Sequence, residues 1–170
     1  MVGAVSRRLL KELKDYQKEP NPDLAELSPI QDDNILIWKA ELRGEADTPY
    51  EGIISLDISE EMYCCKRGKV LKCGFIPGGH WTLHIDIPKT YPIHPPKIKF
   101  VTKICHPNVS FKTGEICLDI LKTAWSPAWT LQSACMAIRL LLSNPEPTSP
   151  LNCDAANLLR CGDLMGYESL

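Results

Sequence analysis

Four side chains that could take part in catalysis lie within fourteen positions near the middle of the chain: His106, Asn108, Cys117 and Asp119. A thiolate is a strong side-chain nucleophile near neutral pH, and an amide beside it can stabilise a developing oxyanion. Free cysteines are nevertheless usually inert. The surrounding segment, 101–130, has no helical or strand period but is rich in apolar residues and prolines. We expect an ordered loop packed on the core, where functional sites commonly lie.

A helix is predicted before this segment. Apolar residues recur every three or four positions over 5–18, which is typical of an amphipathic helix. Basic residues form a second stripe along it, namely Arg7, Lys11, Lys14 and Lys18. The stripe is either a solvated face or a surface that attracts an acidic partner.

Three segments alternate apolar and polar residues, 38–43, 81–87 and 97–100, which predicts half-buried antiparallel strands. The connection 53–78 between the first two is too long for a simple hairpin, and we expect at least one extra strand within it, with 53–58 as a candidate. The segment forms either a binding surface of its own or only additional packing.

Two helices are predicted near the end, one over 131–143 capped by Thr130 and a short one capped by Asp154. The predicted fold class is α+β: an N-terminal helix, a four-stranded antiparallel meander with an insertion in its first hairpin, and C-terminal helices on one face. We expect residues 1–170 to form a single domain.

Composition excludes several classes of protein. The chain has 170 residues, 44% of them hydrophobic, and a net charge of −2, so it presents no overall positive field for nucleic acid. No secretory signal is recognisable, and we expect a cytoplasmic protein with reduced cysteines. No Cys-x-x-Cys pair supports a metal site.

Seven motifs, taken in this order, resemble the ubiquitin-conjugating (UBC) family over nearly the whole chain. They are Arg8-Leu9-Leu10-Lys11-Glu12-Leu13, Pro49-Tyr50-Glu51-Gly52, Tyr91-Pro92-Ile93-His94-Pro95-Pro96-Lys97, His106-Pro107-Asn108, Gly114-Glu115-Ile116-Cys117-Leu118-Asp119-Ile120-Leu121, Trp125-Ser126-Pro127-Ala128 and Pro150-Leu151-Asn152. The segment 125–163 is most similar to the peroxisomal branch of the family.

The resemblance implies that Cys117 accepts the C-terminal glycine of ubiquitin as a thioester and passes it to a lysine or cysteine. Asn108 matches an amide that stabilises the oxyanion or orders the loop, two roles that the sequence leaves open. Asp119 matches a carboxylate that orients the incoming amine. We expect His106 to be a structural histidine, because Pro107 fixes it in a turn.

The sequence departs from the family pattern at two places in the site. Nine positions separate Asn108 from Cys117 where most members have eight, so one residue is added. Ser149 occupies the gate position, where many members carry an acid. The missing carboxylate predicts a slower attack by lysine or a greater use of thiol acceptors.

The resemblance also implies partners. Arg7, Lys11 and Lys14 match the helix that meets the activating enzyme, which uses the ATP, so no cofactor is expected on this chain. Ile93, Pro127 and Ala128 match the contact for RING-type ligases. The peroxisomal likeness implies import receptors as substrates and a membrane-anchored partner that holds the protein at the cytosolic face of the peroxisome. A disulfide between Cys105 and Cys153 is conceivable, although a reducing compartment disfavours it.

Two other functions stay open at this point. One is a catalytically inactive UBC-like scaffold, which the presence of Cys117 disfavours. The other is a cysteine hydrolase that uses Cys117, His106 and Asn108, which needs a well-placed histidine as base.

Overall fold

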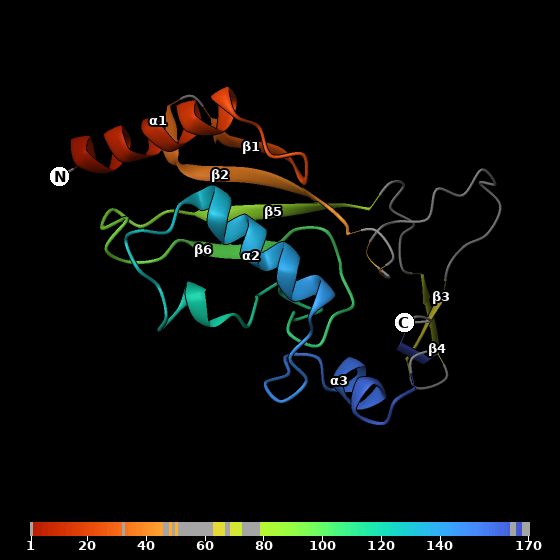
Figure 1. The fold of residues 1–170 in the computed structure, drawn as a ribbon. Helices are drawn as coiled ribbons and strands as arrows, with labels where there is room; N and C mark the ends of the chain where they lie inside the picture. The colour runs from red at the N-terminus through yellow and green to blue at the C-terminus, as the bar shows by residue number, and fades with distance from the viewer. Residues whose placement is uncertain are drawn as a thin grey trace, which may run out of the picture.

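A four-stranded antiparallel sheet with helices packed against it positions the candidate site (Figure 1). The computed structural model describes residues 2–31, 33–45, 48, 50, 63–66, 69–72, 79–163, 166 and 167. The strand order is β1-β2-β5-β6, built from Leu24–Gln31, Asn34–Arg43, His80–Asp86 and Lys97–Phe100. The predicted α+β class and four-stranded meander are therefore confirmed.

The predicted alternation places one face of the sheet in the core. Trp38, Ala40 and Leu42 of β2 are fully buried, as are Leu83 and Ile85 of β5. The paired register sets Trp38 opposite Ile85 and Ala40 opposite Leu83, so the buried side chains of the two strands lie together.

β1 is a strand that the alternation did not predict. Its pairing with β2 shifts register between Leu24 and Glu26, and its buried leucines, Leu24 and Leu27, are three residues apart. A bulge of this kind breaks the period of two. β1 also contains Pro29, which a strand at the edge of a sheet tolerates.

The segment 53–78 contains a second, two-stranded sheet, β3 (Tyr63–Lys66) paired with β4 (Lys69–Lys72). The expectation of an extra strand is thus confirmed, while the candidate strand 53–58 lies outside the described residues. The predicted position in the first hairpin is wrong. Because β1 forms the first hairpin with β2, the segment lies in the second one, between β2 and β5.

Three α-helices complete the described fold. α1 (Val2–Lys18) packs against β1 and α2, and α2 (Leu131–Ser143) packs against β1 and β2. Thr130 caps α2, as predicted. It does so in a capping box with Ser133, which was not predicted from the sequence. α3 (Cys153–Arg160) lies beyond the end of α2 (Figure 1).

The cap of α3 is Asn152 and not Asp154. The Asn152 side chain accepts a hydrogen bond from Ala155 N, while Asp154 lies in the first turn. An acidic residue in the first turn still favours the helix, because it faces the positive end of the helix dipole.

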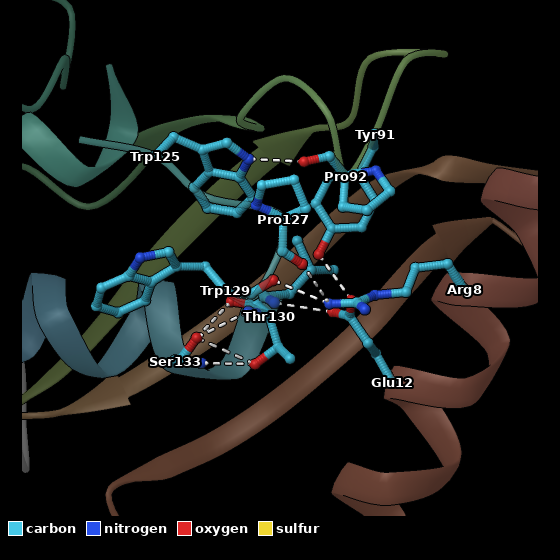
Figure 2. Close-up of polar contacts among 10 residues, drawn as sticks. Arg8, Glu12, Tyr91, Pro92, Trp125, Pro127, Trp129, Thr130 and Ser133 are labelled. Atoms are coloured by element: carbon cyan, nitrogen blue, oxygen red, sulfur yellow. Dashed lines mark hydrogen bonds and ion pairs between the residues drawn. The ribbon is translucent and has the colours of Figure 1, made fainter. Parts of the chain in front are cut away.

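A buried carboxylate ties α1 to the start of α2 (Figure 2). Glu12 accepts hydrogen bonds from Arg8 Nε at 2.6 Å, from the Tyr91 hydroxyl at 2.7 Å and from Leu131 N at 2.8 Å. Leu131 N belongs to the first turn of α2 and has no partner within the helix, so Glu12 satisfies a buried donor and complements the helix dipole. Burial and the nearby Glu12 carboxylate raise the pKa of Tyr91, which keeps its hydroxyl protonated as a donor.

Replacing Glu12 with glutamine tests this tie. The neutral amide presents two N–H donors to a pocket already lined by donors, so Glu12→Gln is expected to lower the free energy of unfolding by about 2–3 kcal/mol in urea denaturation. The exposed Glu19 at the end of α1 provides the control, since Glu19→Gln should change stability by less than about 0.5 kcal/mol. Equal losses in the two variants would show that the buried carboxylate has no special role.

Candidate functional site

Cys117 follows a tight turn anchored to the sheet. Val109 pairs with Ile116 in an antiparallel bridge, and Cys117 N donates to Asn108 O at 2.8 Å. Gly114 closes the turn with a φ of 74°, and a Cβ there would lie 2.0 Å from Phe100 O. Glycine is therefore required for the turn to approach β6. The nucleophile candidate is fixed by backbone contacts at both ends of the turn.

The Cys117 thiol is partly exposed, and two polar groups lie beside it. Ser149 Oγ is 3.4 Å from Cys117 Sγ, and Lys122 Nζ donates to the sulfur at 3.7 Å. The gate position identified in the sequence thus lies next to the cysteine. Lys122 was not identified there, because the short 3₁₀ turn η1 (Asp119–Leu121) that brings it back toward Cys117 leaves no periodic signal.

Asn108 holds the second loop against the first. Its Nδ2 donates to Glu146 O at 2.7 Å and to Ser149 O at 3.1 Å, and its Oδ1 accepts from Glu146 N at 2.8 Å. The side chain is 1% exposed. Both amide hydrogens and the amide oxygen are engaged, so the contacts are those of a loop-ordering residue.

His106 is a buried, neutral histidine. Its Nδ1 accepts from Asn108 N at 3.0 Å, and its Nε2 donates to Leu141 O at 3.0 Å. Burial lowers the pKa of His106 to about 4, against the opposite effect of the Leu141 carbonyl. Both ring nitrogens are occupied by hydrogen bonds to the backbone, so in this structure neither is available as the base that a Cys-His hydrolase needs.

Asp119 is exposed at the first residue of η1. Its backbone oxygen accepts from Lys122 N and Ala124 N, both at 2.9 Å. These bonds curl the chain after Cys117, so that the carboxylate of Asp119 and the amine of Lys122 are carried by the turn that follows the thiol.

A groove of about 1070 Å³ runs from β6 to this turn. The side chains of Ile98, Ile116 and Leu121 give it apolar walls, and Lys122 and Leu151 also line it. Lys122 therefore borders both the groove and the thiol.

The two sets of predicted partner residues lie on the surface. Arg7, Lys11 and Lys14 are exposed on α1, and Ile93 is 70% exposed. Pro127 and Ala128 are exposed on the loop before α2.

Hydrogen bonds join the loops that carry Ile93 and Pro127. Trp125 Nε1 donates to Pro92 O at 2.8 Å, and Arg8 Nη2 donates to Pro127 O at 3.3 Å and to Trp129 O at 3.0 Å (Figure 2). The two loops and α1 thus form one connected surface.

Two further predictions concerned a possible disulfide between Cys105 and Cys153 and a metal site, which the sequence did not support. Cys105 and Cys153 do not form a disulfide with each other in the structure. The described part of the chain contains no group of three metal-ligating residues and no helix long and apolar enough to cross a membrane.

Together, the fold and the site define a class of protein: an α+β domain that carries a partly exposed cysteine on an ordered loop at the edge of its sheet. Residues 71–168 match the family described as ubiquitin-conjugating enzyme. The chain therefore belongs to the ubiquitin-conjugating enzyme family, whose members are ubiquitin transferases.

Three members of the family can be compared with the chain individually. The chain is 47% identical to Protein PEROXIN-4 of Arabidopsis thaliana, over 96% of this chain and 87% of that protein. It is 46% identical to ubiquitin-conjugating enzyme E2 pex4 of Dictyostelium discoideum, over 98% and 93%. It is also similar to the ubiquitin-conjugating enzyme Pex4p of H. polymorpha, solved in complex with the soluble domain of Pex22p, with a TM-score of 0.77, 39% identity and coverage of 96% and 91%.

The neutral His106 predicts a pH dependence of stability. The unfolded state binds a proton near pH 6.5 and the folded state only near 4, so His106 contributes stability above 6.5 that is lost as the pH falls toward 4. The expected loss is about 3 kcal/mol. Urea denaturation of wild type and His106→Gln at pH 7 and pH 4 measures it, because the difference between the two proteins should shrink by that amount.

The ¹⁵N signals of the imidazole provide a second readout that needs no variant. They should report a neutral ring protonated at Nε2 down to pH 5. Protonation of the folded-state ring near pH 6.5 would contradict the prediction.

Proposed function

We propose that Cys117 accepts ubiquitin from the activating enzyme as a thioester and transfers it to a lysine or cysteine of a substrate. The observation that carries this proposal is the partly exposed Cys117 Sγ on a turn fixed by backbone hydrogen bonds. A macromolecular donor can reach such a sulfur. The turn keeps the sulfur in one position while ubiquitin is received and then passed on.

Thioester transfer asks little of the protein beyond position. The acceptor attacks the thioester carbonyl, the C–S bond breaks, and the Cys117 thiolate leaves. Asp119, exposed on the turn after Cys117, orients the incoming amine, and Asn108 acts by ordering the second loop. The chain uses no cofactor of its own in this scheme, because the activating enzyme consumes the ATP.

Two surfaces receive the partners of the reaction. The exposed basic stripe of Arg7, Lys11 and Lys14 receives the activating enzyme. Ile93, with Pro127 and Ala128, receives a RING-type ligase, because an exposed apolar side chain beside a fixed loop is suited to anchor a protein interface.

The relatives support a peroxisomal role. They carry the names PEROXIN-4 and pex4, and one of them is seen in complex with the soluble domain of Pex22p. By analogy, a membrane-anchored partner holds this chain at the cytosolic face of the peroxisome, where peroxisomal import receptors are its substrates.

Loading by the activating enzyme tests the proposal. With ubiquitin, activating enzyme and ATP, the wild type should form an adduct that a thiol reductant removes. Cys117→Ala should abolish the adduct, and Cys117→Lys should form a stable isopeptide. Cys161→Ala, which changes the exposed cysteine that caps the end of α3, should load normally. Absence of any adduct would favour a scaffold, and release of free ubiquitin from conjugates would favour a hydrolase.

The serine at the gate position generates a second prediction. Ser149 Oγ lies 3.4 Å from the sulfur, so a carboxylate at this position would lie beside an attacking amine and could accept its proton. Ser149→Asp is expected to speed single-turnover discharge to free lysine about tenfold, with little effect on discharge to free cysteine. Ser149→Asn, of similar size and uncharged, is the control, and an equal gain in both variants would contradict a role for the charge.

A further inference from the structure

Lysine side chains line the groove beside Cys117. The apolar walls of this groove include Ile98 and Ile116, which are 7% and 6% exposed. Lys97 and Lys99 of β6 also line it, and both are exposed. Neither lysine forms an ion pair within the part of the chain that the structure describes. Two positive charges next to an apolar surface are therefore available to a ligand.

The acidic residues of the groove do not neutralise its lysines. Asp86 has its Oδ1 3.3 Å from Nε2 of His84, on the same strand. Glu115 lies opposite Lys99 in a backbone bridge, but among the described residues their side chains form no ion pair. With Lys122, three lysines line the groove against two carboxylates, which leaves an excess of positive charge. Apolar walls concentrate such a field, so the groove favours an acidic ligand.

We propose that this groove binds an extended acidic segment of the acceptor substrate, beside the lysine or cysteine that receives ubiquitin. The inference rests on the proposed thioester at Cys117 and names the class of acceptor that the site selects. The groove reaches the thiol, because Lys122, one of its lining residues, has its Nζ 3.7 Å from Cys117 Sγ. A segment bound there holds its own nucleophile close to the thioester, which raises the effective concentration of that nucleophile.

The spacing of Lys97 and Lys99 predicts the pattern of the ligand. They alternate with the buried Ile98 on β6, so their side chains leave the strand on one face, about 7 Å apart. An extended peptide repeats at the same interval, so two acidic residues separated by one position match the two lysines. The expected acceptor segment therefore carries the pattern Glu-x-Glu or Asp-x-Asp, where x is any residue, near its cysteine or lysine.

Loading of Cys117 frees a third cation in the groove. In the free enzyme, Lys122 Nζ donates to Cys117 Sγ. The sulfur of a thioester carries no charge and is a weak acceptor, so the ammonium of Lys122 loses this partner when ubiquitin is attached. The ammonium is then available to a carboxylate of the acceptor. The acidic segment is therefore expected to bind the loaded enzyme more tightly than the free one.

Single-turnover discharge to peptides tests the preference. The loaded full chain is given N-acetylated peptides that carry one cysteine, no other nucleophile, and either Glu-x-Glu or Gln-x-Gln at increasing separations from the cysteine. Far below saturation, the best-placed Glu-x-Glu peptide is expected to discharge the enzyme about five- to tenfold faster than its Gln-x-Gln counterpart. The preference should shrink when the ionic strength rises from about 0.05 M to about 0.5 M, because the lysines are exposed.

Charge reversal assigns the preference to the groove. The double variant Lys97→Glu/Lys99→Glu is expected to reverse the order, so that a peptide with Lys-x-Lys becomes faster than the one with Glu-x-Glu. Lys112→Glu makes the same change at an exposed lysine that does not line the groove, and should keep the wild-type order. Each rate is divided by the discharge of the same enzyme to free cysteine, which removes any effect on the thioester itself. If the double variant does not load, Lys97→Glu and Lys99→Glu are measured singly.

Three results would overturn the acidic groove and leave the proposed function intact. The first is a wild type that does not prefer Glu-x-Glu at any separation. The second is a peptide order that the groove variants do not change, or that Lys112→Glu changes equally. The third is an equal loss of discharge to peptides and to free cysteine, which would place the donor ubiquitin in the groove. Failure of the wild type to form a thioester on Cys117 overturns both proposals.

Discussion

The geometry of the site depends on a buried turn, His106–Asn108, that holds two loops together. One side of the turn faces the helix α2 through His106 and Leu141 O, and the other holds the backbone at Glu146 and Ser149 through Asn108. Pro107 O also accepts from Leu151 N and Asn152 N at 2.8 and 2.9 Å. The His106 ring and the Asn108 amide are neutral and buried, so losing a partner of either would leave a buried polar atom unpaired at a cost of about 1–3 kcal/mol. These hydrogen bonds hold the loop that faces Cys117, and salt does not screen them as it would screen an ion pair.

The same turn limits which groups are available for chemistry. His106 and Asn108 are the residues that a nucleophilic cysteine would ordinarily be expected to use, and both are engaged in holding the backbone. The groups left beside the thiol are the hydroxyl of Ser149 and the amine of Lys122. A site of this composition holds a reactive bond in position and leaves proton transfer to the acceptor or to water. This arrangement suits an activated thioester, whose transfer needs little assistance.

The sequence was most informative where a period or a motif was present. Alternation predicted β2, β5 and β6, and the loop between His106 and Asp119 was recognised by its residue types. β1 was missed because a bulge sets Leu24 and Leu27 three residues apart. Register shifts of this kind depend on the partner strand and leave no pattern in one strand alone.

The sequence proposed residues for the candidate site but did not predict their contacts. Whether Asn108 stabilises an oxyanion or orders a loop could not be read from the motif, because both roles need the same amide. The partners of that amide are backbone groups at Glu146 and Ser149, 38 and 41 residues away in the chain. Lys122 was missed for a related reason, since only the 3₁₀ turn after Cys117 makes a separation of five residues a contact.

The contacts of Glu12 explain how the basic stripe on α1 and the surface around Ile93 and Pro127 are held in fixed positions relative to each other. Arg8 and Glu12 of α1 bond the segments that carry Pro127 and begin α2 (Figure 2). Arg7 and Lys11 on the same helix are exposed. The buried Glu12 and the partly buried Arg8 fix the distance between α1 and the loop, and the exposed residues supply only charge. Because exposed charges contribute little to stability, the exposed residues can be replaced to suit another partner without disturbing the contacts between α1 and the loop. Substitution of the buried carboxylate, in contrast, would disturb the helix, the α2 terminus and both loops together.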